Sequence, residues 1–290
     1  MHPFTYEAPT SLDAALGQLG AAAPRAALLA GGTDLIVQLR GGQSTPDAVI
    51  DVKRIPELRR LQLDDTELCL GAAVSCWELS RNEDVRSAYP GLMEAAELIG
   101  SMQIQGRATV GGNLCNASPA ADTIPALIAI GALAVVASAD GERQLPVEEF
   151  VVGPGRNALH PGELLVELRV PPAAERSADA YLRFTPRAEM DIAVVGAGVS
   201  VTLDASGNCT DARAALGAVA ERALLVPEIA AALVGGPVDA AALDRAAAAA
   251  RAAARPISDK RGTATFRTRL AGVLTRRAAA RAAERARGAR

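Results

Sequence analysis

The first 55 residues alternate short apolar runs with amphipathic stretches. Positions 12, 15, 16 and 19 are apolar at helical spacing, and Thr10 precedes them as a candidate helix cap. Segments 4–6, 26–29 and 48–52 read as strands, and 35–39 reads as a helix. A proline and a cluster of charged residues follow near position 55. We therefore expect a compact αβ unit, a first subdomain, over residues 1–55.

Residues 56–175 carry more strands and one long polar interruption. Strands are predicted at 61–63, 67–70, 133–136 and 164–168, and helices at 75–79, 92–99 and 123–130. Small and polar residues dominate from 103 to 122, which makes a poor core and a suitable ligand wall. Pro171-Pro172 marks a linker. We expect a second subdomain over 56–175.

From residue 176 onwards, strands come first and helices follow. Strands are predicted at 181–184, 192–203 and 209–219, and helices at 227–234, 239–254 and 265–285. Strands followed by helices are typical of α+β proteins. The pattern predicts an α+β chain that ends in a small α/β domain over 176–290, with a three-stranded sheet covered by helices.

Composition places the chain among ordinary globular proteins. Its 290 residues are 50% hydrophobic and 22% charged. The net charge of −3 lacks the excess of positive charge that is typical of proteins that bind nucleic acid. No apolar run reaches the roughly 18 residues of a membrane span. The N-terminal residues lack the basic and apolar regions of a signal peptide. We expect a cytoplasmic protein with no nucleic-acid partner and no membrane span.

Two glycine doublets, each followed by small polar residues, are the strongest candidates for a binding site. Gly31-Gly32 lies between a predicted strand and a predicted helix and is followed by Thr33-Asp34; Gly111-Gly112 is followed by Asn113. Glycine lets the backbone approach a ligand closely, and free N–H groups at a helix start favour an anion. A single doublet is more often an ordinary turn than a binding site, but a matched pair favours a nucleotide cofactor.

The doublets do not match the common nucleotide-binding motifs. Neither forms Gly-x-Gly-x-x-Gly, and no Lys-Ser/Thr follows the first, which argues against a Rossmann dinucleotide site and a P-loop. Two segments about eighty residues apart could instead hold a diphosphate between them. No lysine cluster lies near either. Backbone N–H groups and neutral side chains such as Thr33, Thr109, Asn113 and Ser118 would bind the phosphates.

Cysteine and histidine positions predict no metal centre in this chain. Cys69, Cys76, Cys115 and Cys209 form no Cys-x2-Cys pair and no ferredoxin-type spacing. His2 and His160 are the only histidines. A histidine metal site or a Ser–His–Asp triad is therefore not expected, and no residue is assigned a catalytic role.

Three segments of the chain stand out together: Ala-Gly-Gly-Thr-Asp-Leu at 30–35, Ala-Thr-Val-Gly-Gly-Asn-Leu at 108–114 and Asn-Ala-Ser-Pro-Ala-Ala-Asp at 116–122. In this order they resemble the FAD-binding medium subunit of molybdenum hydroxylases, the family of xanthine dehydrogenase and aerobic carbon monoxide dehydrogenase. The resemblance continues through 162–165 and 183–195, and so covers nearly the whole chain.

The resemblance implies an FAD-binding domain of the p-cresol methylhydroxylase type, split into two subdomains, followed by the small C-terminal domain. For each implied FAD contact, the plain alternative is a turn glycine, a helix cap or a core aliphatic. The residues implied to bind FAD are Ala30, Gly31, Gly32, Thr33, Asp34, Leu35, Ile99, Ala108, Thr109, Gly111, Gly112, Asn113, Ser118, Asp122, Leu165 and Arg183.

Two positions depart from the family pattern. The family often has a lysine near the flavin where this chain has Arg183, which keeps the charge in a planar group. We hypothesise that Arg183 tunes the flavin potential. The usual Gln-Ile-Arg-Asn appears here as Gln103-Ile104-Gln105-Gly106, which removes a charge.

The resemblance also implies a role in electron transfer. This chain would carry FAD, while partner subunits would carry a molybdenum cofactor and 2Fe–2S clusters. The implied partners are an iron–sulfur small subunit and a molybdenum large subunit, in a dimer of heterotrimers. Electrons would come from the iron–sulfur subunit and leave for an external acceptor. Two alternatives remain: a stand-alone flavin-dependent oxidoreductase of the same fold, and a scaffold subunit without FAD.

Overall fold

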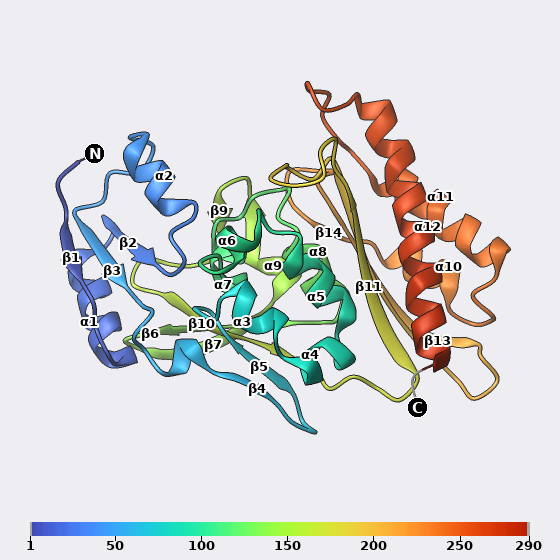
Figure 1. Ribbon diagram of the computed structural model, residues 1–290, viewed down its shortest axis with the longest axis horizontal. Coiled ribbons are helices and arrows are strands. Elements are labelled where there is room, and N and C mark those ends of the chain that lie inside the picture. Colours follow the sequence, from blue (N-terminus) through green and yellow to red (C-terminus); the bar gives the residue numbers. More distant parts are fainter. Residues whose placement is uncertain (1, 289–290) are drawn as a thin grey trace.

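The computed structural model describes residues 2–288 and arranges three main sheets in sequence order along the long axis of the molecule (Figure 1). The first block contains a three-stranded parallel sheet with the order β1-β3-β2, so the chain crosses over between neighbouring strands. Its elements are β1 (Thr5–Glu7), α1 (Leu12–Ala22), β2 (Ala26–Leu29), α2 (Leu35–Arg40) and β3 (Ala48–Asp51).

The second block is built on a five-stranded antiparallel sheet with the order β4-β5-β10-β6-β7. Several short helices separate β5 from β6 along the chain. The elements are η1 (Glu57–Arg59), β4 (Leu61–Leu63), β5 (Leu68–Gly71), α3 (Cys76–Ser80), α4 (Glu83–Ala88), α5 (Pro90–Glu97), α6 (Met102–Gln105), α7 (Val110–Cys115), α8 (Thr123–Ala129), β6 (Leu133–Ser138), β7 (Gly141–Pro146), α9 (Val147–Phe150), β8 (Val151–Gly153), β9 (Arg156–Asn157) and β10 (Leu164–Val170).

The third block is an antiparallel sheet with the order β11-β12-β13-β14, and α12 runs along it (Figure 1). Its elements are β11 (Ser177–Phe184), β12 (Val195–Leu203), β13 (Cys209–Gly217), β14 (Leu224–Leu225), α10 (Pro227–Leu233), α11 (Ala240–Ala253) and α12 (Ala264–Gly288). The chain is thus an α+β protein, as the pattern of strands and helices predicts. The expected boundaries after residues 55 and 175 stay predictions.

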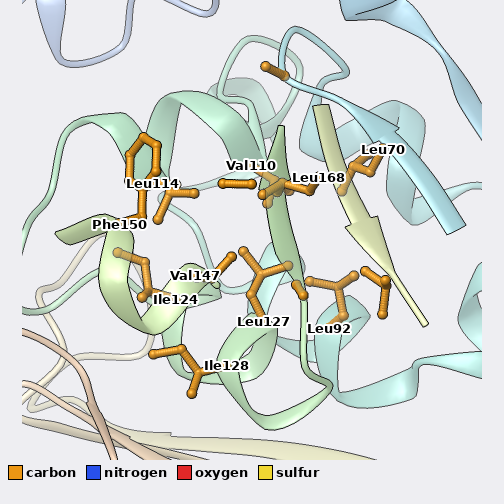
Figure 2. Close-up of a cluster of buried hydrophobic side chains, with 14 of the residues drawn as sticks. Leu70, Leu92, Val110, Leu114, Ile124, Leu127, Ile128, Val147, Phe150 and Leu168 are labelled. Atoms are coloured by element: carbon orange, nitrogen blue, oxygen red, sulfur yellow. The ribbon is translucent and has the colours of Figure 1, made fainter. Parts of the chain in front are cut away.

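The largest core lies where α7, α8 and α9 pack on the five-stranded sheet. Figure 2 shows Leu168 and Leu70 from the sheet together with Leu114 and Leu127 from the helices, and all four side chains are fully buried. Burying a leucine contributes about 1.5–3 kcal/mol. This core fixes the position of α7, which carries the second glycine doublet.

The structure corrects one helix cap and one sheet. Ser11, not Thr10, caps α1, because its Oγ accepts a hydrogen bond from the Ala14 N–H at 3.3 Å. The C-terminal sheet has four strands instead of three. The added strand, β14, pairs with β13, with Leu225 opposite Ala215 and Leu224 opposite Leu216. A strand of two residues is too short for a hydrophobic pattern to predict.

The structure also places the second glycine doublet on a helix and corrects the start of one strand. Gly111-Gly112 lies inside α7, which Thr109 caps and whose inner face Val110 and Leu114 bury. The strand expected from residue 192 begins at Val195. An irregular segment precedes it, in which Arg187 pairs with Asp191 at 3.3 Å.

A polar cluster joins α12 to α5 and to the edge strand β11. The Glu94 carboxylate accepts hydrogen bonds from Arg285 at 2.5 Å, from Arg281 at 3.1 Å and from the Tyr181 N–H at 2.9 Å. The Asp179 carboxylate accepts one from the Leu92 N–H at 3.0 Å, at the start of α5. The second and third blocks are therefore joined by carboxylates that accept hydrogen bonds from otherwise free N–H groups, one at the start of α5 and one on the edge strand β11.

Asp179 should make the stability of the protein depend on pH. Burial raises the pKa of Asp179 from 3.8 to about 7, although Arg285 and the N–H groups at the start of α5 oppose this effect and Glu94 adds to it. The folded protein then holds a proton that the unfolded chain has released, so stability falls as the pH rises from about 4 through 7. We expect the free energy of unfolding to drop by roughly 2–4 kcal/mol over that range.

Chemical denaturation between pH 4 and pH 8 measures this effect. Asp179→Asn keeps the shape of the side chain and cannot ionise, so the fall between pH 4 and pH 7 should shrink by that amount. A pH profile that the substitution leaves unchanged would contradict the prediction.

Candidate functional site

A cavity of about 570 Å³ lies between the first and second blocks. Three parts of the chain form its walls: β2 with the first glycine segment (residues 30–35), the second glycine segment (108–114) on α7, and the start of β10 with the residues before it. A volume of this size is typical of small-molecule and cofactor sites.

The first glycine segment connects β2 to α2 and lies directly against the second. Gly31 packs on the backbone of Arg107 and Ala108, where a Cβ atom would overlap with the Arg107 carbonyl group. Gly32 has a φ of 78°, in the left-handed region that favours glycine. These two glycines therefore let the segment turn tightly and bring both glycine segments to one cavity.

Backbone donors of the first glycine segment are available to a ligand. Within residues 2–288, the N–H groups of Gly31 through Leu35 find no protein acceptor. Asp34 stands at the start of α2 without making a side-chain cap. A run of free N–H groups beside a helix start is suited to bind phosphate oxygens.

The second glycine segment is held by its own cap and by a link to α8. Thr109 Oγ1 accepts a hydrogen bond from the Gly112 N–H at 2.9 Å. Asn113 Oδ1 accepts one from the Thr123 hydroxyl at 2.7 Å. These bonds fix the orientation of Thr109 and Asn113, which both line the cavity.

Most of the residues expected at the site line this one cavity. Ile99 and Leu165, far from the doublets in sequence, add apolar wall. Ser118, Asp122 and Arg183 are not among the lining residues, and their proposed contact with FAD stays a prediction. The expected residues that line the cavity are Ala30, Gly31, Gly32, Thr33, Asp34, Leu35, Ile99, Ala108, Thr109, Gly111, Gly112, Asn113 and Leu165.

Asp122 and Arg183 form a buried ion pair with Tyr181. Asp122 accepts a hydrogen bond from Arg183 Nη1 at 2.6 Å and another from the Tyr181 hydroxyl at 2.8 Å. The Arg183 and Asp122 side chains are only 6% and 8% exposed. Burial raises the pKa of Asp122, and the Arg183 charge opposes that effect. Both charges are therefore already paired within the protein.

The residues that line the cavity offer a ligand mainly uncharged hydrogen-bond donors. No lysine or arginine occurs among the described residues that line it. Burial raises the pKa of Asp34, and a hydrogen bond from Arg143 lowers the pKa of Glu163 to about 2 although burial opposes it. The donors that this lining offers to an anion are therefore backbone N–H groups and neutral side chains, and the diphosphate contact expected from the sequence stays a prediction.

Several lining residues were not expected from the sequence. Gln38 lies three positions after Leu35 and four after Asp34, so helical spacing could have placed all three on one face of α2. Asn157 and the segment 159–163 also line the cavity, and their polar, proline- and glycine-containing sequence before β10 is typical of a binding loop. Asn116 contributes from the end of α7.

Residues 2–288 contain neither a cluster of metal-binding side chains nor a helix suited to a membrane. Within them, no group of three or more histidine, cysteine, aspartate or glutamate side chains is arranged to hold a metal ion. No helix in that part of the chain combines the length and the apolar character needed to cross a membrane.

Comparison with known proteins gives full-length similarities. Residues 2–173 match the family described as the FAD binding domain in molybdopterin dehydrogenase, and residues 180–282 match the CO dehydrogenase flavoprotein C-terminal domain. The carbon monoxide dehydrogenase medium chain of Afipia carboxidovorans is 34% identical over 284 residues, which are 98% of each chain. The nicotinate dehydrogenase FAD-subunit of Eubacterium barkeri is 32% identical over 82% of each chain.

A solved structure shares the whole fold. The carbon monoxide dehydrogenase from Hydrogenophaga pseudoflava, in a form that lacks the Mo-pyranopterin moiety of the molybdenum cofactor, superposes with a TM-score of 0.93 at 34% sequence identity. The match covers 98% of this chain and 99% of that chain.

Proposed function

Because this chain belongs to the family of FAD-binding domains in molybdopterin dehydrogenases, we propose that it is the FAD-carrying electron-transfer subunit of a molybdenum hydroxylase complex. In that role it takes electrons from an iron–sulfur subunit and passes them to an external acceptor. One observation carries the proposal: both glycine segments line a single cavity, and the first offers free N–H groups to a ligand there.

The residues of the cavity fit FAD. The N–H groups of the first glycine segment and the polar side chains of Thr33, Thr109 and Asn113 would hold the diphosphate. Ile99 and Leu165 would supply apolar wall for the rings. When bound, FAD supplies the redox chemistry, and the protein contributes binding, orientation and the exclusion of water.

Ser118, Asp122 and Arg183 complete the proposed set of FAD contacts. Each carboxylate oxygen has two lone pairs, so Asp122 could accept another hydrogen bond beside those from Tyr181 and Arg183. Thr123 follows Asp122 and bonds to Asn113, which links this buried group to the cavity wall.

The proposed partners are an iron–sulfur small subunit and a molybdenum-containing large subunit, in a cytoplasmic dimer of heterotrimers. The names of two relatives, a medium chain and an FAD-subunit, support the part of this proposal that makes the chain one subunit of a larger complex. We propose that residues 1–55 and 56–175 are the two FAD-binding subdomains and that 176–290 form the C-terminal domain.

Flavin analysis of the purified full chain tests the proposal. We expect yellow protein with one FAD per chain and the absorption spectrum of bound flavin. Chain that takes up no FAD, even after incubation with excess FAD, would exclude the electron-transfer role and favour a scaffold subunit.

Affinity purification of the native protein tests the assembly. We expect co-purification of a subunit with iron and of a subunit with molybdenum. An active flavoprotein that purifies alone, with its own substrate and neither metal, would favour the stand-alone oxidoreductase.

A further inference from the structure

Helix α2 forms one wall of the cavity and is only weakly anchored by its own packing. Leu39 is its single buried residue, while Ile36 and Val37 are 40% and 64% exposed. In Figure 1, α2 lies at the upper end of the first block. A short helix with so little buried apolar surface opens easily unless another contact holds it.

One side-chain hydrogen bond ties α2 to the opposite wall. Gln38 Nε2 donates to Asn116 Oδ1 at 3.1 Å, between residues 78 positions apart in the sequence. Asn116 is the C-cap of α7, so the bond connects the helix that follows the first glycine segment to the helix that carries the second. Both side chains line the cavity.

This bond acts at a different place from the backbone contact between the same two segments. Gly31 packs on Arg107 and Ala108 before α2 begins, and thereby fixes the N-terminal side of the helix. Gln38 lies near its C-terminal end. The far end of α2 is therefore held over the cavity by the Gln38–Asn116 bond together with the buried Leu39 side chain.

We propose that the Gln38–Asn116 hydrogen bond is a latch that keeps α2 closed over the cavity and slows the release of FAD. This inference rests on the proposed FAD-binding function. Gln38 and Asn116 are positioning residues: they hold the wall that carries the free N–H groups.

The latch predicts faster FAD release when either amide is removed. Losing one partly buried hydrogen bond between neutral groups corresponds to about a five- to tenfold change in an equilibrium constant. We expect Gln38→Ala and Asn116→Ala in the full chain each to raise the FAD dissociation rate by about that factor. The double variant should release FAD no faster than either single variant, because both remove the same bond.

Release is measured from the recovery of flavin fluorescence after dilution of FAD-loaded protein. Gln43→Ala is the matched control, since this exposed glutamine follows the same helix without lining the cavity. It should release FAD at the wild-type rate. Unchanged release from Gln38→Ala, or strictly additive effects in the double variant, would overturn the latch.

Hydrogen exchange at the α2 amides gives a second readout that needs no bound FAD. We expect Gln38→Ala and Asn116→Ala to exchange about five- to tenfold faster than wild type at α2, with no change in the five-stranded sheet. Unchanged exchange at α2 would overturn the latch even if FAD binds. A wild-type chain that binds no FAD would instead overturn the proposed function, and the exchange result would still decide whether the latch exists.

Discussion

Replacing Gly31 with alanine is expected to abolish FAD binding by the full chain. The new Cβ atom would overlap with the Arg107 carbonyl oxygen, lie 2.7 Å from its carbonyl carbon and lie 3.0 Å from the Ala108 Cα. All of these are backbone atoms, so no side chain can rotate away. The two glycine segments would have to separate, at a cost of about 3 kcal/mol or more, equivalent to over 100-fold in affinity. Titration of the variant with FAD, followed by flavin fluorescence, measures this loss.

Gly17→Ala is the matched control for that experiment. Gly17 lies in α1, and a Cβ atom built there meets nothing within 4 Å. Alanine in a helix is more favourable than glycine by about 0.5–1 kcal/mol. We expect Gly17→Ala to bind FAD normally and to unfold at a slightly higher denaturant concentration. Normal FAD affinity in Gly31→Ala would show that the segments do not need this close contact.

Replacing Arg183 with alanine is expected to lower the free energy of unfolding by about 3–5 kcal/mol. The substitution leaves the Asp122 carboxylate buried beside Tyr181 without its cation, and an unpaired buried charge is strongly unfavourable. Urea denaturation at neutral pH measures the change. A loss below about 1 kcal/mol, the usual value for an exposed pair, would contradict the prediction.

A variant that removes both charges separates lost charge pairing from lost packing. Asp122→Asn combined with Arg183→Met keeps similar volume and leaves no buried charge. Replacing a buried ion pair with neutral groups is often close to neutral in stability. We therefore expect the double variant to be markedly more stable than Arg183→Ala alone.

Redox titration of Arg183→Ala tests the separate hypothesis that Arg183 tunes the flavin potential. In the folded protein Arg183 and Asp122 together carry no net charge. Removing the Arg183 guanidinium leaves the buried Asp122 carboxylate without its cation. A more negative surrounding disfavours an anionic reduced flavin, so the hypothesis predicts a lower midpoint potential in the variant. An unchanged midpoint potential would exclude the tuning hypothesis, whereas a clear shift would support it.

Much of the fold follows from local patterns that the sequence displays directly. Helical spacing of apolar residues predicts α1, and apolar runs predict β2, β3 and β10, because burial of one face dictates these periods. The elements that were missed are short or lack a pattern of their own. β14 has two residues, and its pairing with β13 decides its conformation. The strand at 141–146 is exposed on several positions, so its polar sequence gave no strand pattern.

The sequence by itself indicated that two glycine segments are candidates for one nucleotide site, because glycine and free N–H groups have chemistry that is independent of context, and the family resemblance added Ile99 and Leu165. Only the tertiary structure decided how they meet. Gly31 packs on Arg107, Gln38 reaches Asn116 and Arg183 reaches Asp122 across 61 residues of sequence. Such contacts depend on the relative positions of whole blocks, and those positions are set by cores to which distant parts of the chain contribute. No local pattern contains that information, so the cavity, its latch and its buried ion pair emerge only when the chain is folded.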